Sequence, residues 1–166
     1  VGRHLRRRAW AAILWDIVGI SLYVNLRFPQ WSYGIAGVVA LVHDVLITVG
    51  ALALTQRPMS LELVAALLTI AGYSINDTIV IYDRIRELHR TTRKMTLPAI
   101  INLAVNQMLS RTLLTSGVTL LTVIALYGWG GDVLNDFAFA LLVGFVSGVY
   151  STIYIASPLL IAWARP

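Results

Sequence analysis

The sequence contains no cysteine and few charged residues. The absence of cysteine excludes disulfides and thiolate-bound metals, because both need the cysteine sulfur. Only 13% of the residues are charged, against roughly 25% in soluble domains, and 58% are hydrophobic. At a length of 166 residues, this composition leaves no room for a large soluble domain beside several membrane spans. The composition therefore predicts a polytopic membrane protein.

Signatures of nucleic-acid binding and of catalysis are also missing. The net charge of +5 comes without an aromatic-rich basic patch outside the apolar runs, so we expect no nucleic-acid partner. No His-Glu-x-x-His motif is present, and His43 is the only histidine in the predicted spans. Gly72-Tyr73-Ser74 superficially resembles a membrane serine-protease elbow, but single Gly-x-Ser patterns are common in membrane spans. An enzyme would have to show turnover that depends on Ser74 or His43. We expect no enzymatic activity, no metal and no cofactor.

Five apolar runs are long enough to cross a bilayer, which takes about 20 helical residues. The sequence predicts an all-α transmembrane bundle, residues 9–166, with spans at residues 9–26, 33–54, 61–82, 99–127 and 137–163. Residues 1–8 are expected to form a basic leader outside the membrane, and residues 83–98 a polar loop. Ser60 is expected to cap the third span, and Pro98 to lie in the first turn of the fourth. The chain begins Val1-Gly2-Arg3, without initiator Met or signal peptide, and is expected to belong to a longer protein.

Asp77 lies inside the third apolar run. An ionised carboxylate in hydrocarbon is costly, so a carboxylate at this position is a functional hypothesis by default. Arg111, in the fourth span, is the opposite charge with which Asp77 is expected to pair. Because a neighbouring cation favours the ionised carboxylate and burial favours the protonated one, a helix movement that separates the pair would switch Asp77 between the two forms. The alternative is a static ion pair that only joins two helices.

Small and hydroxylated residues surround each ionisable group at helical spacing, where residues three and four apart share a face. The three stripes are Gly37, Ala40, Asp44, Thr48, Ala51 and Thr55; Thr69, Tyr73, Ser74 and Asp77; and Gln107, Arg111, Thr115, Thr119 and Thr122. We expect all three stripes to face the bundle interior. Ordinary interhelical hydrogen bonding is the alternative role for the Ser and Thr residues.

His43-Asp44 is a second candidate site, because a His–Asp pair can relay protons. The alternative is that Asp44 bonds to a neighbouring helix while His43 packs nearby. We expect the possible accessory residues for proton conduction to be Asp44, His43, Asn76, Ser74, Gln107 and Thr115. Asp16 lies nearer a membrane edge, where we expect a polar contact only. Gly144-x-x-x-Gly148 and Ser147-x-x-x-Ser151 are interpreted as tight helix packing.

Five segments carry a family resemblance: Val39–Val45, Ala65–Val80, Asp83–Glu87, Leu109–Ser116 and Gly130–Leu134. In these segments the sequence resembles the SecF subunits of the bacterial SecD/SecF protein-export complex. The likeness covers nearly the whole chain. It is weaker at Ala104–Met108, where the family more often has small or hydroxylated residues around Asn and Gln. It is also weaker at Gly117-Val118, where the family usually has a Thr-rich run.

The resemblance implies the last five spans of a six-span protein, half of a resistance-nodulation-division-like membrane domain, without the first span and the periplasmic domain that follows it. The leader would be periplasmic, and residues 83–98 and the C-terminus cytoplasmic, in the bacterial inner membrane. The charges of the loops by themselves favour this orientation only slightly. By the same resemblance, the partners would be SecD, the SecYEG channel and the translocating polypeptide, besides the lipid bilayer.

The resemblance also implies that the proton-motive force, or sodium in some species, drives translocation. Asp77 and Arg111 match the intramembrane residues that the family is thought to use in proton conduction. The alternative function is a structural scaffold subunit that conducts no ion itself.

Overall fold

The computed structural model describes residues 2–28, 30–92 and 94–163. Its elements are α1 (Gly2–Arg27), α2 (Trp31–Leu54), α3 (Leu61–Thr91), α4 (Leu97–Trp129), α5 (Asp132–Ser151), the π-helical turn η1 (Thr152–Ala156) and α6 (Ser157–Trp163). The five segments long and apolar enough to cross a membrane are Arg6–Arg27, Trp31–Leu54, Leu61–Thr91, Leu97–Trp129 and Asp132–Trp163. The predicted all-α, five-span fold is confirmed. Pro29 in the first predicted turn, Arg93 in the polar loop, and residues 1 and 164–166 lie outside the described residues.

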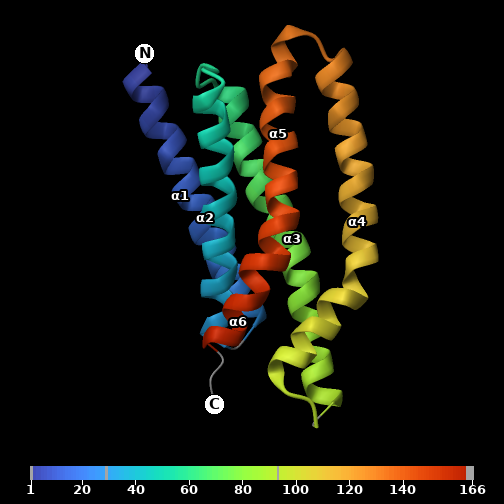
Figure 1. Ribbon diagram of the computed structural model, residues 1–166. Coiled ribbons are helices and arrows are strands. Elements are labelled where there is room, and N and C mark those ends of the chain that lie inside the picture. The colour runs from blue at the N-terminus through green and yellow to red at the C-terminus, as the bar shows by residue number, and fades with distance from the viewer. Residues whose placement is uncertain (1, 29, 93, 164–166) are drawn as a thin grey trace.

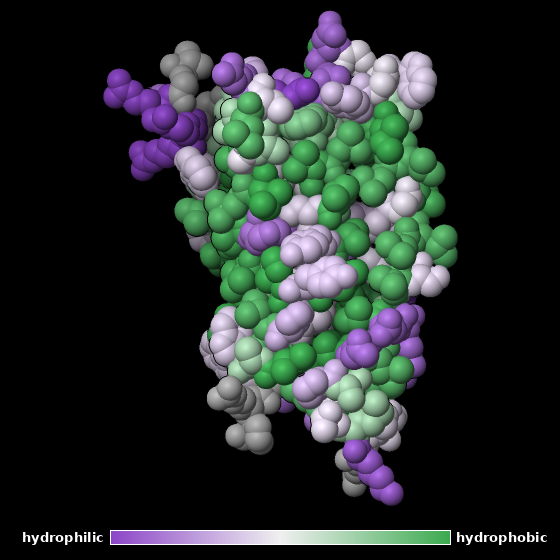
Figure 2. All heavy atoms as spheres, in the orientation of Figure 1, coloured by the Kyte–Doolittle hydropathy of each residue, from purple (hydrophilic) through white to green (hydrophobic). Residues whose placement is uncertain are grey.

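The helices run side by side along one axis, with α1 and α4 at the two edges of the bundle (Figure 1). Helices α2, α3 and α5 lie between them, and α5 packs against α2, α3 and α4. The start of α1 and the end of α6 lie at opposite ends of the bundle, as five crossings require (Figure 1). Apolar side chains form a belt across most of the visible face, with hydrophilic side chains concentrated at both ends and a few within the belt (Figure 2).

Two helix starts follow the expected local chemistry. The backbone N–H of Leu63 donates to Ser60 Oγ at 3.3 Å, so Ser60 caps α3 as predicted. Pro98 lies in the first turn of α4, where its missing N–H removes no helical hydrogen bond. The first and last spans begin earlier than predicted. The basic leader is not a separate segment, because α1 is helical from Gly2 onward, and α5 begins at Asp132.

The predicted polar loop at residues 83–98 is wrong for its first half, because α3 continues to Thr91. The extension carries a buried apolar face, in which Ile81, Ile85 and Leu88 recur at helical spacing. Its exposed face is polar, and Arg84 Nη1 donates to Glu87 Oε2 one turn later at 2.6 Å. The charged residues that suggested a loop are therefore the solvated side of an amphipathic helix.

The last span consists of α5, η1 and α6, and it bends at the π-helical turn η1 (Figure 1). Its cause lies in Ser157-Pro158. Proline has no N–H to donate to the carbonyl of Tyr154 four residues earlier, and its ring crowds that carbonyl. Ser157 Oγ instead donates to the carbonyl of Thr152 at 2.9 Å. The wider turn helps to place both Ser151 and Thr152 in the buried interior.

The Gly144-x-x-x-Gly148 pattern of α5 packs tightly on α3, as predicted. A Cβ atom at Gly144 would collide with the Ile70 side chain, and one at Gly148 would lie 3.2 Å from Ser74 Cβ. These two glycines allow the two helices to approach closely enough for polar side chains to bond between them.

Gly144→Ala should therefore lower the free energy of unfolding by about 1–3 kcal/mol, the usual cost of overpacking. Ile70→Ala in the same chain should remove most of the added cost, because it makes room for the new methyl group. The matched control is Gly72→Ala, whose Cβ would meet nothing within 4 Å. Thermal unfolding in detergent compares the unchanged chain, the three single variants Gly144→Ala, Ile70→Ala and Gly72→Ala, and the double variant, in which the added cost of Gly144→Ala is counted from Ile70→Ala alone. Equal effects of Gly144→Ala and Gly72→Ala would contradict the packing argument.

Candidate functional site

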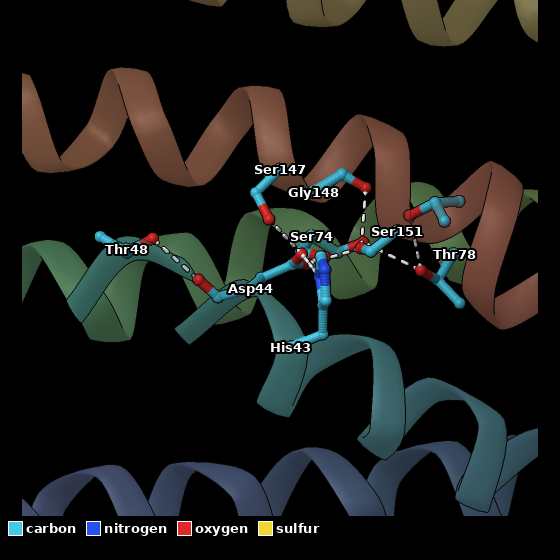
Figure 3. A network of polar contacts seen from close by, with 9 residues as sticks. His43, Asp44, Thr48, Ser74, Thr78, Ser147, Gly148 and Ser151 are labelled. Atoms are coloured by element: carbon cyan, nitrogen blue, oxygen red, sulfur yellow. Dashed lines mark hydrogen bonds and ion pairs between the residues drawn. The ribbon is translucent and has the colours of Figure 1, made fainter. Parts of the chain in front are cut away.

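Asp44 of α2 is fully buried and lies at the centre of a polar cluster that joins three helices (Figure 3). Its Oδ2 accepts hydrogen bonds from Ser74 Oγ of α3 at 2.6 Å and from Ser151 Oγ of α5 at 2.7 Å. Its Oδ1 accepts a hydrogen bond from Ser147 Oγ of α5 at 2.7 Å. We call these four residues the Asp44 cluster. The three hydroxyl donors replace water around the carboxylate, without which its burial would be prohibitively costly.

His43 connects this cluster to the surface of the bundle. Its Nδ1 lies 3.1 Å from Asp44 Oδ1, and 30% of its side chain is exposed. The exposed part of the ring lines an apolar groove of about 600 Å³ between α2 and α5. Tyr150 lines the same groove, with its ring centroid 6.1 Å from that of His43. The expected contact between His43 and Asp44 is formed, and its role in proton transfer remains a prediction.

Hydroxyl groups continue the cluster along α2, α3 and the π-helical turn η1 (Figure 3). Thr48 Oγ1 donates to the backbone carbonyl of Asp44 at 2.8 Å. Thr78 Oγ1 donates to the carbonyl of Ser74 at 3.1 Å and lies 2.9 Å from Thr152 Oγ1 in the π-helical turn. The bend in the last span is therefore linked through side chains to the residues around Asp44.

The interpretation of Ser147-x-x-x-Ser151 as a packing motif alone is incomplete. Both serines bond to the Asp44 carboxylate, a role that their spacing did not reveal. A signal was nevertheless present, because two hydroxyls four residues apart share a helix face and a buried carboxylate on another helix needs donors. The pairing of that face with Asp44 depends on how the helices pack.

Asp77 of α3 is only 6% exposed and has a different partner from the one expected. Ser116 Oγ of α4 donates to Asp77 Oδ2 at 3.3 Å. Among the ion pairs formed by the described residues, none joins Asp77 to Arg111. The expected direct ion pair is therefore not formed. Arg111 directly precedes the buried Thr112, so its side chain leaves α4 about 100° away from the packed face.

The expectation that all three stripes face inward is correct for only part of them. Asp44, Thr48, Ser74 and Asp77 are buried. On α4 the predicted stripe is wrong for Gln107, Arg111, Thr115 and Thr122, which are exposed. Its Thr119 is half-buried and accepts a hydrogen bond from Tyr73 of α3 at 3.2 Å. The buried positions of α4 are Ile100, Ile101, Ala104, Thr112, Ser116 and Val123. The reason is that α4 lies at the edge of the bundle and packs through one side only (Figure 1).

The accessory candidates separate accordingly. The structure brings His43 and Ser74 to Asp44, whereas Asn76, Gln107 and Thr115 are exposed and lie apart from it. Gln107 instead accepts a hydrogen bond from Arg84 Nε at 2.8 Å. Asp16 is half-buried, and the expected polar contact is not seen among the hydrogen bonds and ion pairs of the described residues. Within those residues, no three His, Asp or Glu side chains are grouped to hold a metal ion.

Comparison with known proteins gives consistent matches. Residues 1–166 match the family model described as protein export membrane protein SecD/SecF, C-terminal. The protein translocase subunit SecF of Koribacter versatilis is 50% identical over 163 residues, which are 98% of this chain and 40% of that protein. SecF of Desulfurispirillum indicum is 48% identical over 169 residues, covering 100% of this chain and 53% of that protein. The chain thus spans about half the length of these relatives or less.

A solved structure is also similar. The crystal structure of SecDF from Thermus thermophilus, a translocon-associated membrane protein, matches with a TM-score of 0.95 at 46% identity. The match covers 100% of this chain and 23% of that chain.

Proposed function

Because the chain belongs to the SecD/SecF C-terminal family of protein export membrane proteins, we propose that it is the membrane part of a SecF-type translocase subunit. The observation that carries this proposal is the family match over residues 1–166, which leaves no part of the chain unaccounted for. The close structural match to SecDF supports it. The chain would lie in the bacterial inner membrane, with the start of α1 periplasmic and the α3–α4 connection and the C-terminus cytoplasmic.

A SecD-type partner is supported by the exposed polar side chains of α4. Arg111 and Thr115 are exposed on a membrane-spanning helix, where lipid offers no hydrogen-bond partners. Another subunit packed on this side would supply those partners. The similarity to a SecDF protein in Thermus thermophilus agrees with such an arrangement. SecYEG and the translocating polypeptide are the further partners that this function requires.

The proposed mechanism is a conformational change coupled to the proton-motive force. Asp77 is the proton acceptor, because its environment can change with little disruption. Among the described residues it has one hydrogen bond from a side chain, at 3.3 Å, whereas three serines fix Asp44 at 2.6–2.7 Å. While Asp77 is ionised it attracts Arg111, and protonation removes that attraction. Moving one charge through 100 mV supplies about 2.3 kcal/mol. This free energy is enough to change the relative populations of two arrangements of α3 and α4.

Arg111 is the residue that adjusts how readily Asp77 takes up a proton. The Asp44 cluster is an accessory that holds α2, α3 and α5 in register. The coupling ion is H⁺, with Na⁺ as the alternative. The scaffold alternative rests on a static Asp77–Arg111 ion pair between helices. Because the described residues form no ion pair between Asp77 and Arg111, the proton-coupled mechanism is favoured over that alternative.

The export function is tested by a chimera in which residues 1–166 replace the corresponding C-terminal part of a host SecF. In cells depleted of their own SecF, the chimera should restore export, measured as conversion of secreted precursors to their mature forms. The control is the host SecF without that part. If the chimera inserts in the membrane at normal amounts and precursors still accumulate, the proposed function is wrong.

A further inference from the structure

We propose that the outward face of α1 is a binding site for an anionic phospholipid. The headgroup end of the site is a hollow of about 430 Å³ lined by Arg3, His4, Arg6, Arg7 and Trp10. The three arginines are exposed and lie three and four residues apart, so they share one side of the helix. Guanidinium groups bind phosphate oxygens in a bidentate manner, which suits them to a phospholipid headgroup.

The positive charge of this end is not neutralised within the described chain. The ion pairs of the described residues involve Arg27 with Asp83, Arg57 with Asp136, Arg84 with Glu87 and His43 with Asp44. None includes an arginine of the α1 start. The first acidic residue of the sequence is Asp16, more than two helical turns beyond Arg8. By contrast, two of the arginines at the opposite end of the bundle already have carboxylate partners.

The same side of α1 continues with a surface suited to the rest of a phospholipid. Trp10 is 54% exposed and lies about one turn inside the span that begins at Arg6, a place that suits an indole ring at the membrane interface. Leu14 and Val18 follow at helical spacing and are 60% and 53% exposed. Figure 2 shows the hydrophilic group at this end directly bordering the apolar belt. Cations, an interfacial aromatic ring and an apolar track therefore follow one another in the order of headgroup, glycerol region and acyl chain.

The occupant is a lipid and not free phosphate, because the apolar track would add nothing to the binding of an inorganic ion. A helix of another protein would need acidic residues level with the arginines and would compete for the same face. The proposal is independent of protein export, since it depends only on α1 and its position in the bilayer.

The experiment is native mass spectrometry of the protein in detergent with phosphatidylglycerol or phosphatidylcholine added. Phosphatidylglycerol should bind more tightly, and its affinity should fall roughly 100-fold in the Arg3→Gln/Arg6→Gln/Arg7→Gln variant, at about a factor of five for each basic residue. Raising the salt concentration should weaken the same binding in the unchanged protein, which tests the proposal even if the variant misfolds. Inorganic phosphate at equal concentration should not compete.

The matched control removes the same charge at the other surface, in Arg84→Gln/Arg86→Gln/Arg90→Gln, and should retain phosphatidylglycerol binding. Equal affinity for the two lipids would overturn the proposal, as would an equal loss in the two triple variants. Displacement by inorganic phosphate would assign the hollow to a free anion. If lipid selectivity is absent and a membrane protein is crosslinked at Leu14, the face belongs to a protein partner and the lipid site is refuted.

Discussion

Asp77→Asn and Arg111→Met are each expected to abolish the part of protein export that depends on the proton gradient. Asparagine is similar in size to aspartate but cannot take up a proton. Methionine keeps a long side chain at position 111 but removes the positive charge of arginine. Export without the gradient should continue. The fold should be retained, because among the described residues the Asp77 side chain bonds only to Ser116, and Arg111 is exposed. The measurement is export into membrane vesicles with and without an imposed proton gradient.

The charge-matched controls are Asp132→Asn and Arg90→Met, which alter exposed residues near the helix ends. They should leave gradient stimulation intact. Export that is still stimulated by the gradient in Asp77→Asn or Arg111→Met would refute the proton-coupled role. The combined variant separates the two functions, since a scaffold would recover activity when both charges are removed and a proton-coupled device would not.

The second large effect is expected at the Asp44 cluster. Replacing Ser74, Ser147 or Ser151 by alanine should lower the free energy of unfolding by about 1.5–3 kcal/mol each, because a buried carboxylate loses a charge-assisted hydrogen bond. The losses should exceed their sum when two serines are removed, since fewer donors remain to solvate the charge. Denaturant or thermal unfolding in detergent gives these values.

Ser110→Ala is the control, because Ser110 is exposed on α4 and its loss should change the free energy of unfolding by less than about 0.5 kcal/mol. In an Asp44→Asn background, each serine replacement should cost less than in the unchanged chain, because the carboxylate charge is gone. Serine replacements that cost no more than Ser110→Ala would contradict the solvation role. Equal costs in the two backgrounds would show that the serines act independently of Asp44.

The polar stripes show how far local pattern extends toward the site. Helical spacing brought Ser74 and Asp77 onto one face of α3, and both are buried as expected. The same reasoning on α4 selected Arg111, and the structure buries Ser116 five residues later. Spacing tells which residues share a face, but the face that packs depends on the neighbouring helices. In a membrane subunit that has partners, a polar face also has an alternative to the interior, namely another subunit.

Hydropathy and composition determined the all-α fold, the five crossings and the approximate bounds of most spans, because every backbone group in lipid must be bonded within its own helix. They also singled out Asp77 and the His43–Asp44 pair, because a charged side chain in hydrocarbon is costly on any face of a helix. Only the tertiary structure decided that Asp44 is solvated by Ser147 and Ser151 and that Asp77 meets Ser116. These contacts join residues far apart in the chain, and their choice depends on the rotation and packing of whole helices, which a linear pattern does not contain.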